Sequence, residues 1–191
     1  MTTAATANSN YYLIGATAAG ESVPFIATSN ANAGNNTAGV YFNGSTGVLS
    51  GAAWNDYAEF REAKNIDVKN IPYGRCVIEN GDDSVSFSTK RLQPCGQIIS
   101  DTYGFTLGTE ENNLPVALCG RVLAYTYEPH KEFKVGDAVC TGPEGTLSKM
   151  TREEIKEYPD RIVGYVSSIP DYLYWGKANI EVKGRIWIKV K

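Results

Sequence analysis

Asp56 and Glu59 are the two side chains whose chemistry and spacing best suit acid–base catalysis in this sequence. They lie in the stretch AAWNDYAEFRE, residues 52–62. Two carboxyl groups share such work when their surroundings separate their pKa values: the ionised one activates water or a nucleophilic side chain, and the protonated one donates to a departing amide nitrogen. Aromatic neighbours would raise one of the two pKa values by excluding water. These neighbours are Trp54, Tyr57 and Phe60.

The spacing of the two carboxylates limits how they can act together. In a straight strand, Asp56 shares a face with Ala58, whereas Glu59 points to the opposite face. A helical turn would instead bring positions three apart onto one side. Joint action therefore requires a local turn or a contribution from a neighbouring subunit. The alternative is that both are solvated polar residues at the entry to a folded domain.

Other catalytic chemistries have little support in the sequence. The single histidine, His130, is typical of a surface turn, so neither a histidine-based triad nor a histidine metal site is expected. No two cysteines form a CxxC pair, and the motifs GxxxxGK[ST] and GxGxxG are missing. We therefore expect no metal and no cofactor. Three cysteines in apolar runs are expected to be buried, reduced thiols: Cys76, Cys119 and Cys140.

The composition of the chain changes near residue 50. Residues 1–50 contain one charged side chain, Glu21, and short apolar clusters separated by Gly and Asn turns. The pattern fits either a flexible tail or a fibrous β segment that buries its clusters against other copies of itself. Low charge and several aromatic residues favour the fibrous segment. We expect a fibre stem over residues 1–50 and a C-terminal domain over residues 51–191.

The C-terminal domain is expected to be mainly β, with antiparallel strands. Asn80-Gly81 between two β-rich runs predicts a hairpin. The run LPVALCGRVLAYTY, residues 114–127, predicts either a buried strand pair or one bent strand. A Gly-Arg pair stands at the expected start of three strands: Gly74-Arg75, Gly120-Arg121 and Gly184-Arg185.

One short helix and a closing strand complete the expected domain. Thr151 and Glu154 have the spacing of a capping box, so a helix is expected to run from there until Pro159 stops it. IEVKGRIWIKVK, residues 180–191, alternates between apolar and polar positions and predicts a half-buried antiparallel strand. Its polar face holds Glu181, Lys183, Arg185, Trp187 and Lys189.

The stretch NDYAEFRE resembles the DYAE signature that opens the autoproteolytic intramolecular-chaperone domain of phage tailspike and neck-appendage proteins. YPDRIVGYVSSIPDYLYWG resembles the Arg-Ile-x-Gly strand and the Ser-x-x-Pro turn of that family, and VKGRIWIKVK resembles its closing strand. The upstream segment from NYYLIGATAAGE to VYFNGSTGVLSGAAW is similar to the stem that leads into such domains in phage tail fibres. The likeness covers residues 51–191 and, more loosely, the stem.

The resemblance implies a homotrimer at the end of a phage tail fibre or spike, preceded by a trimeric fibrous β stem. Its C-terminal domain would align three chains and then cut itself off. The functional carboxylates of the family fall on Asp56 and Glu59, and the cut would lie between Asn55 and Asp56. The chain departs from many relatives at Asn55, where they have a small residue. An asparagine can cyclise onto its own backbone and break the chain without Glu59, so two cutting mechanisms stay open.

Two other functions fit the same sequence. The domain could form trimers without cutting, or the fibre tip could bind a receptor or glycan through Tyr172, Tyr174 and Trp175, which could instead pack at an interface. The implied partners are further copies of the chain, upstream fibre and tail proteins, and a host-surface glycan or receptor. A net charge of −3 and the lack of a long apolar run argue against nucleic-acid binding and membrane insertion. The resemblance places the protein in the phage tail of the virion, assembled in the bacterial cytoplasm.

Overall fold

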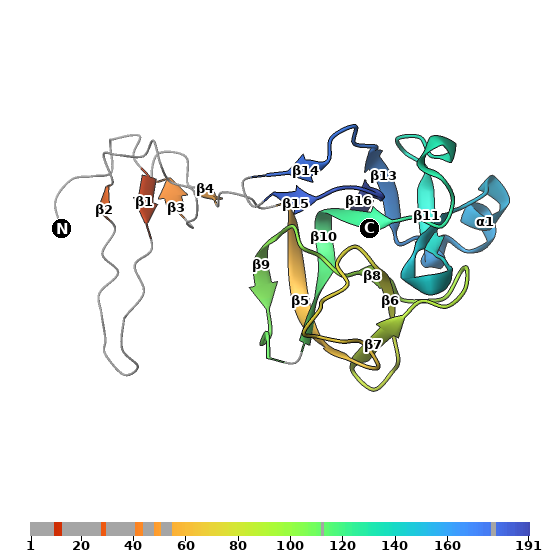
Figure 1. The fold of residues 1–191 in the computed structure, drawn as a ribbon, viewed down its shortest axis with the longest axis horizontal. Coiled ribbons are helices and arrows are strands. Elements are labelled where there is room, and N and C mark those ends of the chain that lie inside the picture. Colours follow the sequence, from red (N-terminus) through yellow and green to blue (C-terminus); the bar gives the residue numbers. More distant parts are fainter. Residues whose placement is uncertain are drawn as a thin grey trace. The chain divides into compact units, whose positions relative to one another are not determined.

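The computed structural model describes residues 10–12, 28–29, 41–43, 48–50, 55–111, 113–176 and 179–191, the first four ranges as backbone only. The chain divides into two compact units, residues 1–54 and residues 55–191. The described residues are mainly β, with one short α-helix, α1 (Arg152–Glu157), so the predicted fold class is confirmed for them (Figure 1).

The N-terminal unit contains one antiparallel sheet of short strands. Its strands are β1 (Asn10–Tyr12), β2 (Thr28–Ser29), β3 (Tyr41–Asn43) and β4 (Val48–Ser50). Their order across the sheet is β2-β1-β3-β4. Strands of two or three residues bury little surface by themselves, because a stable sheet needs a covered apolar face. The association of this segment with further copies of the chain stays a prediction.

The strands of the C-terminal unit form a ten-stranded sheet and a separate two-stranded ribbon. The large sheet contains β5 (Asp56–Ala63), β6 (Cys76–Glu79), β7 (Ser84–Phe87), β8 (Gly96–Ile98), β9 (Tyr103–Leu107), β10 (Asn113–Tyr125), β11 (Ala138–Thr141), β12 (Leu147–Lys149), β13 (Gly164–Ser168) and β16 (Arg185–Val190). The ribbon contains β14 (Tyr174–Trp175) and β15 (Ile180–Glu181). Short 3₁₀ turns lie at His130–Glu132, Pro143–Gly145 and Pro159–Arg161.

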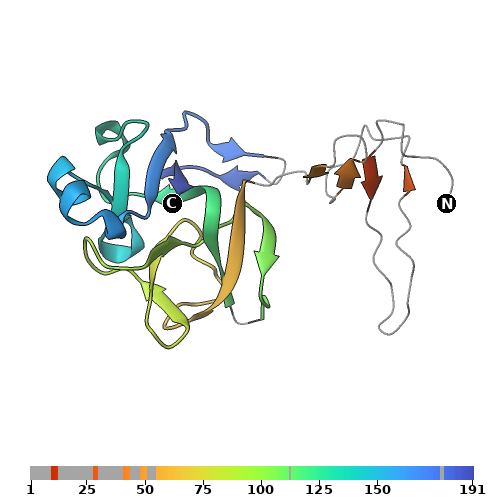
Figure 2. The same ribbon diagram turned by 180° about the vertical axis from the view of Figure 1, so that it is seen from behind.

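The large sheet curls into two rings that share β10. On one side, the path β5-β7-β6-β8 returns to β10 through an antiparallel bridge between Ile99 and Val116. On the other side, the path β16-β13-β11-β12 returns through a parallel bridge between Thr126 and Leu147. Most pairings are antiparallel, and the two parallel ones join β5 to β7 and to β9 (Figures 1 and 2).

Each ring is associated with its own apolar core. Fully buried side chains of the first core are Val77, Val85, Ile99, Leu114 and Val116. The larger second core includes Ile98, Val122, Ala124, Val139, Leu147, Ile186 and Ile188. Because β10 supplies residues to both cores, it holds the two rings together, and β5 is fixed against it along most of its length.

Strand β10 is one bent strand, which decides between the two alternatives for residues 114–127. Its register against β5 shifts between Ala117 and Cys119, where the strand bulges. The bulge leaves Cys119 exposed, so the prediction that this thiol is buried was wrong, whereas Cys76 and Cys140 are buried. Gly120-Arg121 lies inside β10 and does not open a strand.

The local turn and capping predictions are confirmed. Strands β6 and β7 pair antiparallel across the Asn80-Gly81 turn. At the start of α1, the Thr151 hydroxyl accepts from the Glu154 N–H at 3.2 Å, and the Glu154 carboxylate accepts from the Thr151 N–H at 2.8 Å.

The closing segment differs from the half-buried strand that was predicted. A turn divides it into β15 and β16, and both Arg185 and Trp187 on the supposed solvent face are buried. The outer face is covered because Trp175 of β14 packs edge-on against Trp187, with ring centroids 5.1 Å apart. Arg185 is buried with a carboxylate partner, Asp101.

Candidate functional site

Asp56 begins strand β5 between two neighbouring strands. It lies opposite Tyr103 of β9 in one direction and opposite Gly120 of β10 in the other. Its exposed fraction is 6%, so its carboxyl group is buried. Gly120 has φ +108°, and a Cβ there would lie 2.3 Å from the carbonyl oxygen of Asn55. Only glycine therefore lets β10 approach the backbone this closely.

The hydroxyl group of Thr102 holds one oxygen of the Asp56 carboxyl group. The Thr102 hydroxyl donates to Asp56 Oδ1 at 2.7 Å and lies 3.2 Å from the Ser100 hydroxyl. The second oxygen, Oδ2, is buried and has no hydrogen-bond partner in the part of the chain that the structure describes. Burial raises the pKa of Asp56 to about 6, against the opposing effect of the bonds from Thr102 and Ser100.

The backbone of Asn55 is hydrogen-bonded on both sides. The Arg121 N–H donates to the carbonyl oxygen of Asn55 at 2.8 Å, and the Asn55 N–H donates to the carbonyl oxygen of Thr102 at 3.4 Å. The side-chain nitrogen of Asn55, Nδ2, is buried without a partner among the described residues. Unpaired polar atoms therefore stand on both sides of the peptide bond between Asn55 and Asp56.

Glu59 lies in a different environment although it belongs to the same strand. Strand β5 runs unbroken through both positions, so no local turn brings the two carboxylates together. The Glu59 side chain is 36% exposed and pairs with Arg61 at 3.4 Å. Arg61 also reaches Glu79 at 3.5 Å, so Glu59 belongs to a surface ion-pair group.

The aromatic residues around the two carboxylates pack on β9. The ring of Tyr57 stacks on Phe105 with centroids 4.9 Å apart, and Phe60 meets Tyr103 edge-on at 6.2 Å. Trp54 lies outside the described residues. Of the two carboxyl groups, Asp56 is the buried one, and its burial raises its pKa.

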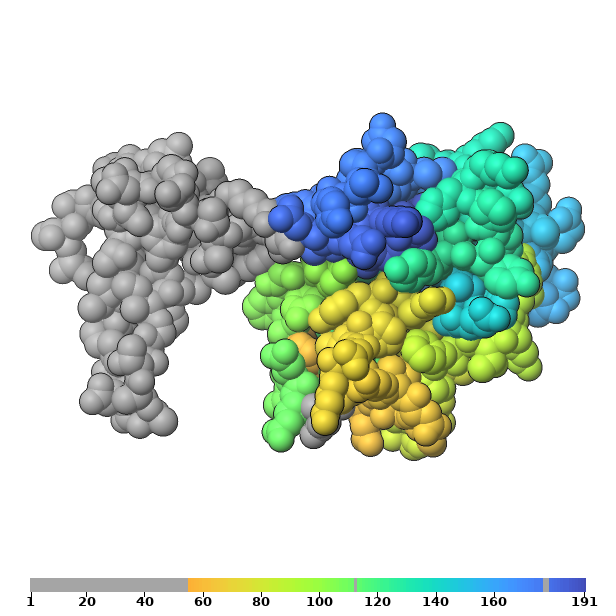
Figure 3. All heavy atoms as spheres, in the orientation of Figure 1, coloured from red at the N-terminus to blue at the C-terminus, as the bar shows by residue number. Residues whose placement is uncertain are grey.

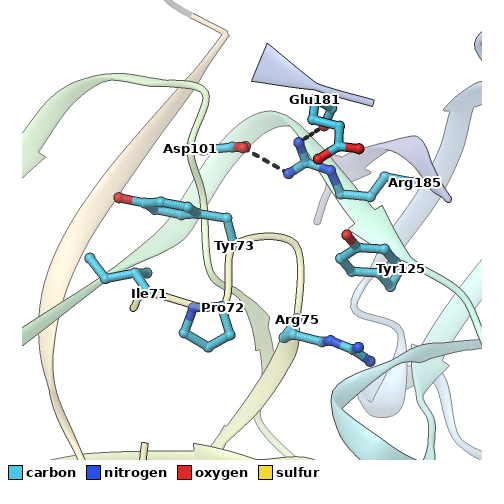
Figure 4. Close-up of a pocket in the computed structure, with 8 residues that line it drawn as sticks. All are labelled: Ile71, Pro72, Tyr73, Arg75, Asp101, Tyr125, Glu181 and Arg185. Carbon is cyan, nitrogen blue, oxygen red and sulfur yellow. Dashed lines mark hydrogen bonds and ion pairs between the residues drawn. The ribbon is translucent and has the colours of Figure 1, made fainter. Parts of the chain in front are cut away.

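A second carboxylate, the half-buried Asp101, lies next to Thr102 in the chain. Arg185 donates to Asp101 Oδ2 at 2.8 Å and also to the carbonyl oxygen of Glu181, while Asp101 Oδ1 has no partner among the described residues (Figure 4). Burial raises the pKa of Asp101, and the charge of Arg185 opposes that rise. The negative charge of Asp101 in turn contributes to the raised pKa of Asp56.

Asp101 and Arg185 line an open pocket of about 430 Å³ (Figure 4). Both of its guanidinium groups already have partners, because Arg75 lies 4.7 Å from the ring centre of Tyr125 and donates to the carbonyl oxygen of Glu144. The two arginines therefore already bind other groups of the protein, and the pocket is of interest because its residues surround the Asp101 carboxylate. Its lining residues are Ile71, Pro72, Tyr73, Arg75, Asp101, Tyr125, Glu181 and Arg185.

Sequence reasoning missed the residues that surround Asp56. The polar triplet Ser100, Asp101 and Thr102 directly follows the apolar pair Ile98-Ile99, and this change from apolar to polar residues was the available signal. Their position beside Asp56 depends on the parallel pairing of β9 with β5, which no local pattern predicts. Arg121 was noticed only as part of a Gly-Arg pair.

The three candidate glycan-binding aromatics have different environments. Trp175 packs on Trp187, and the Tyr172 hydroxyl accepts from Trp187 Nε1 at 2.8 Å. Tyr174 is 61% exposed and its neighbour Leu173 is 63% exposed. The segment that ends in β14 lies at the outer surface of the C-terminal unit (Figure 3). Of the three, Tyr174 offers the most surface to a ligand.

No group of three or more His, Cys, Asp or Glu side chains in the described ranges is arranged to hold a metal ion. No helix among the same residues is long and apolar enough to cross a membrane. Comparison of the chain with protein-family models, with curated proteins and with solved structures found no match. The site itself consists of a buried carboxyl group beside a peptide bond whose carbonyl oxygen is hydrogen-bonded to Arg121.

Proposed function

We propose that this chain is the C-terminal part of a trimeric phage tail fibre or spike, and that it cuts its backbone between Asn55 and Asp56 after assembly. The observation that supports this most is the buried carboxyl group of Asp56, which has one unpartnered oxygen and adjoins the proposed scissile bond. The resemblance of NDYAEFRE to the DYAE signature points to the same bond.

The geometry supports a proton-transfer role for Asp56. A group whose pKa is about 6 exists in both protonation states near neutral pH, as a general acid–base must. The carbonyl oxygen of Asn55 already accepts a hydrogen bond from the Arg121 N–H. When the carbonyl carbon is attacked, this donor stabilises the negative charge that develops on the oxygen. Asp56 then protonates its own departing amide nitrogen. Glu59 remains the surface partner of Arg61 and is given no proton transfer in this scheme.

The sequence and the fold support an assembly role for the two units. A stem with one charged residue in fifty positions must bring three chains into register, which is a slow, non-local search. A C-terminal domain that trimerises first raises the local concentration of the stems. Cutting afterwards prevents the domain from guiding disassembly, so the fibre becomes kinetically trapped.

Mass spectrometry of the freshly folded, full-length chain tests the proposal, combined with light scattering on the same sample. A trimer containing a C-terminal fragment that starts at Asp56 is expected. An intact chain in a stable trimer would instead assign the domain to trimerisation without cutting. A well-folded monomer at all concentrations would remove the fibre proposal altogether.

Glycan binding at the fibre tip is a second candidate function, favoured by the exposure of Tyr174 and Leu173. Aromatic rings with one open face stack on sugars. Tyr174→Ala should abolish binding on a glycan array, whereas Tyr127→Ala, which removes a tyrosine of 62% exposure elsewhere, should not. Trp175→Ala is a poor probe because Trp175 supports Trp187. Equal binding by the wild type and Tyr174→Ala would reject this role.

A further inference from the structure

The two consecutive residues Asn55 and Asp56 each have a buried side-chain atom with no hydrogen-bond partner among the residues described. Buried amide and carboxyl groups are nearly always paired, so each such exception calls for an explanation. The two unpaired atoms, Asn55 Nδ2 and Asp56 Oδ2, belong to the residues on either side of one peptide bond. Elsewhere in the described ranges, such atoms occur only at Gln97 and Asp101.

The backbone around these atoms prepares the Asn55 carbonyl carbon for attack. Its oxygen already accepts the Arg121 N–H at 2.8 Å, and this donor stabilises negative charge on that oxygen as a tetrahedral centre forms. Gly120 permits the close approach of β10 that places Arg121 there. The Asn55 N–H is bonded to Thr102, which holds the residue from its other side.

We infer that Asn55 is itself the nucleophile: its Nδ2 attacks its own backbone carbonyl carbon, closes a succinimide ring and expels the amide nitrogen of Asp56. This inference rests on the proposed cut between Asn55 and Asp56. One bond forms, between Nδ2 and the carbonyl carbon, and one breaks, the peptide bond. Nδ2 loses one proton and the departing nitrogen gains one, so neither water nor an oxidant is consumed.

Asp56 is placed to move that proton. Its Oδ1 is held by the Thr102 hydroxyl, which leaves Oδ2 as the oxygen that can exchange a proton with its surroundings. The hydroxyl of Ser100 and the carboxylate of Asp101 are further polar groups near it, and no lysine or arginine of the described ranges forms an ion pair with Asp56. Glu59 takes no part, because it lies with Arg61 on a different face of β5.

The first test is the chemical form of the N-terminal fragment from the wild-type full-length chain. Acid-quenched samples should contain a fragment lighter by one water than the hydrolysis product, and hydroxylamine in the folding buffer should convert it to a hydroxamate. A fragment that ends only in a free carboxylate, with no hydroxamate, would overturn this inference and leave the proposed cut standing. An uncut chain in a trimer would overturn both.

Variants provide an independent test, with trimer formation by light scattering as the check on folding. Asn55→Ala should slow cutting at least about 100-fold, because the nucleophile is lost. Glu62→Gln, which neutralises an exposed carboxylate on the same strand, should leave the rate unchanged. If Asn55→Ala cuts as fast as the wild type, or if Glu59→Gln is as slow as Asn55→Ala, water activated by carboxylates is the mechanism instead. If Asn55→Ala fails to form trimers, the mass and hydroxamate of the wild-type fragment decide.

Discussion

Two acidic residues of strand β5, Asp56 and Glu59, lie in opposite environments. At the start of β5, Asp56 is 6% exposed, accepts a hydrogen bond from the Thr102 hydroxyl, and has a pKa raised to about 6. Three residues later, Glu59 is 36% exposed and pairs with Arg61. Both residues are flanked by β9 and β10, but their side chains project to opposite faces of the strand, so Asp56 is enclosed beside Thr102 whereas the Glu59 side chain is partly open to solvent.

The comparison teaches that a spacing of acidic residues does not by itself make a catalytic pair. A strand places positions three apart on opposite faces, so one carboxylate is desolvated and the other stays with water and a cation. Asp101 gives an intermediate case, because its side chain is half-buried and paired with a buried cation, Arg185, at 2.8 Å. The following substitutions test how strongly burial and ion pairing make these carboxylates differ in their effects on stability.

Arg185→Met should produce the largest loss of stability. It leaves the half-buried Asp101 without its cation, and breaking a buried ion pair on one side costs about 3–5 kcal/mol. The matched control is Arg61→Met, which removes the cation of Glu59 and should cost less than about 1 kcal/mol. Chemical denaturation of both full-length variants measures the two losses. Equal losses would show that burial does not distinguish these ion pairs.

Asp56 should make the protein less stable as pH rises. Its pKa is about 6 in the folded chain and 3.8 in the unfolded reference, so the folded state binds more protons between these values. At 1.36 kcal/mol per pKa unit, about 3 kcal/mol of stability is present below pH 3.8 and is lost as pH rises through 6.

Denaturation curves recorded at roughly every half pH unit, from about pH 3.5 to about pH 7.5, measure this loss of stability. Chains kept whole by Asn55→Ala, with and without Asp56→Asn, should differ most at pH 7 and least at the acidic end, with Asp56→Asn the more stable at pH 7. Asp101 is present in both chains, so the difference reports Asp56 together with its electrostatic coupling to Asp101. A stability difference between the two chains that stays constant across this pH range would contradict the raised pKa of Asp56.

Gly120→Ala should destabilise the covered end of β5 by at least about 2 kcal/mol, since alanine is disfavoured at φ +108° and its Cβ would meet the Asn55 carbonyl oxygen. The matched control is Gly81→Ala, at φ +77° with no atom within 4 Å, which should cost only about 1 kcal/mol. Thermal and denaturant unfolding of the two variants measure the difference. A smaller loss for Gly120→Ala would mean that β10 is not so close to Asn55.

Glu59→Gln should have the smallest effect on stability. Its ion pair with Arg61 is partly exposed, and such pairs contribute less than about 1 kcal/mol. The measurement is the free energy of unfolding in low and high salt. A loss of several kcal/mol that salt does not reduce would show that Glu59 is in a buried environment, and it would contradict the contrast drawn between Glu59 and Asp56.

Local signals in the sequence were enough for much of the fold. The Thr151–Glu154 capping box and the Asn80-Gly81 turn depend on neighbouring residues only, and both were found where they were expected. Arg185 and Trp187 were misplaced, because their burial depends on a ribbon and on Asp101, which come from distant parts of the chain.

The site was predictable only in part for the same reason. Asp56 stood out as an acid among aromatic residues at a change of composition. Thr102 is bonded to it across 46 positions of sequence, through a parallel strand pairing that leaves no periodic pattern. The bulge in β10 that leaves Cys119 exposed was equally hidden, since an apolar run looks the same with or without an inserted residue.

The most direct test of the central claim compares the cutting rates of Asp56→Asn and Glu59→Gln in folded, full-length chains at neutral pH. Intact mass against time gives both rates beside that of the wild type. The account predicts that Asp56→Asn slows cutting at least about 100-fold, as expected for loss of a general acid–base, while Glu59→Gln stays within about twofold of the wild type. The reverse order, or equal loss in both variants, would contradict it.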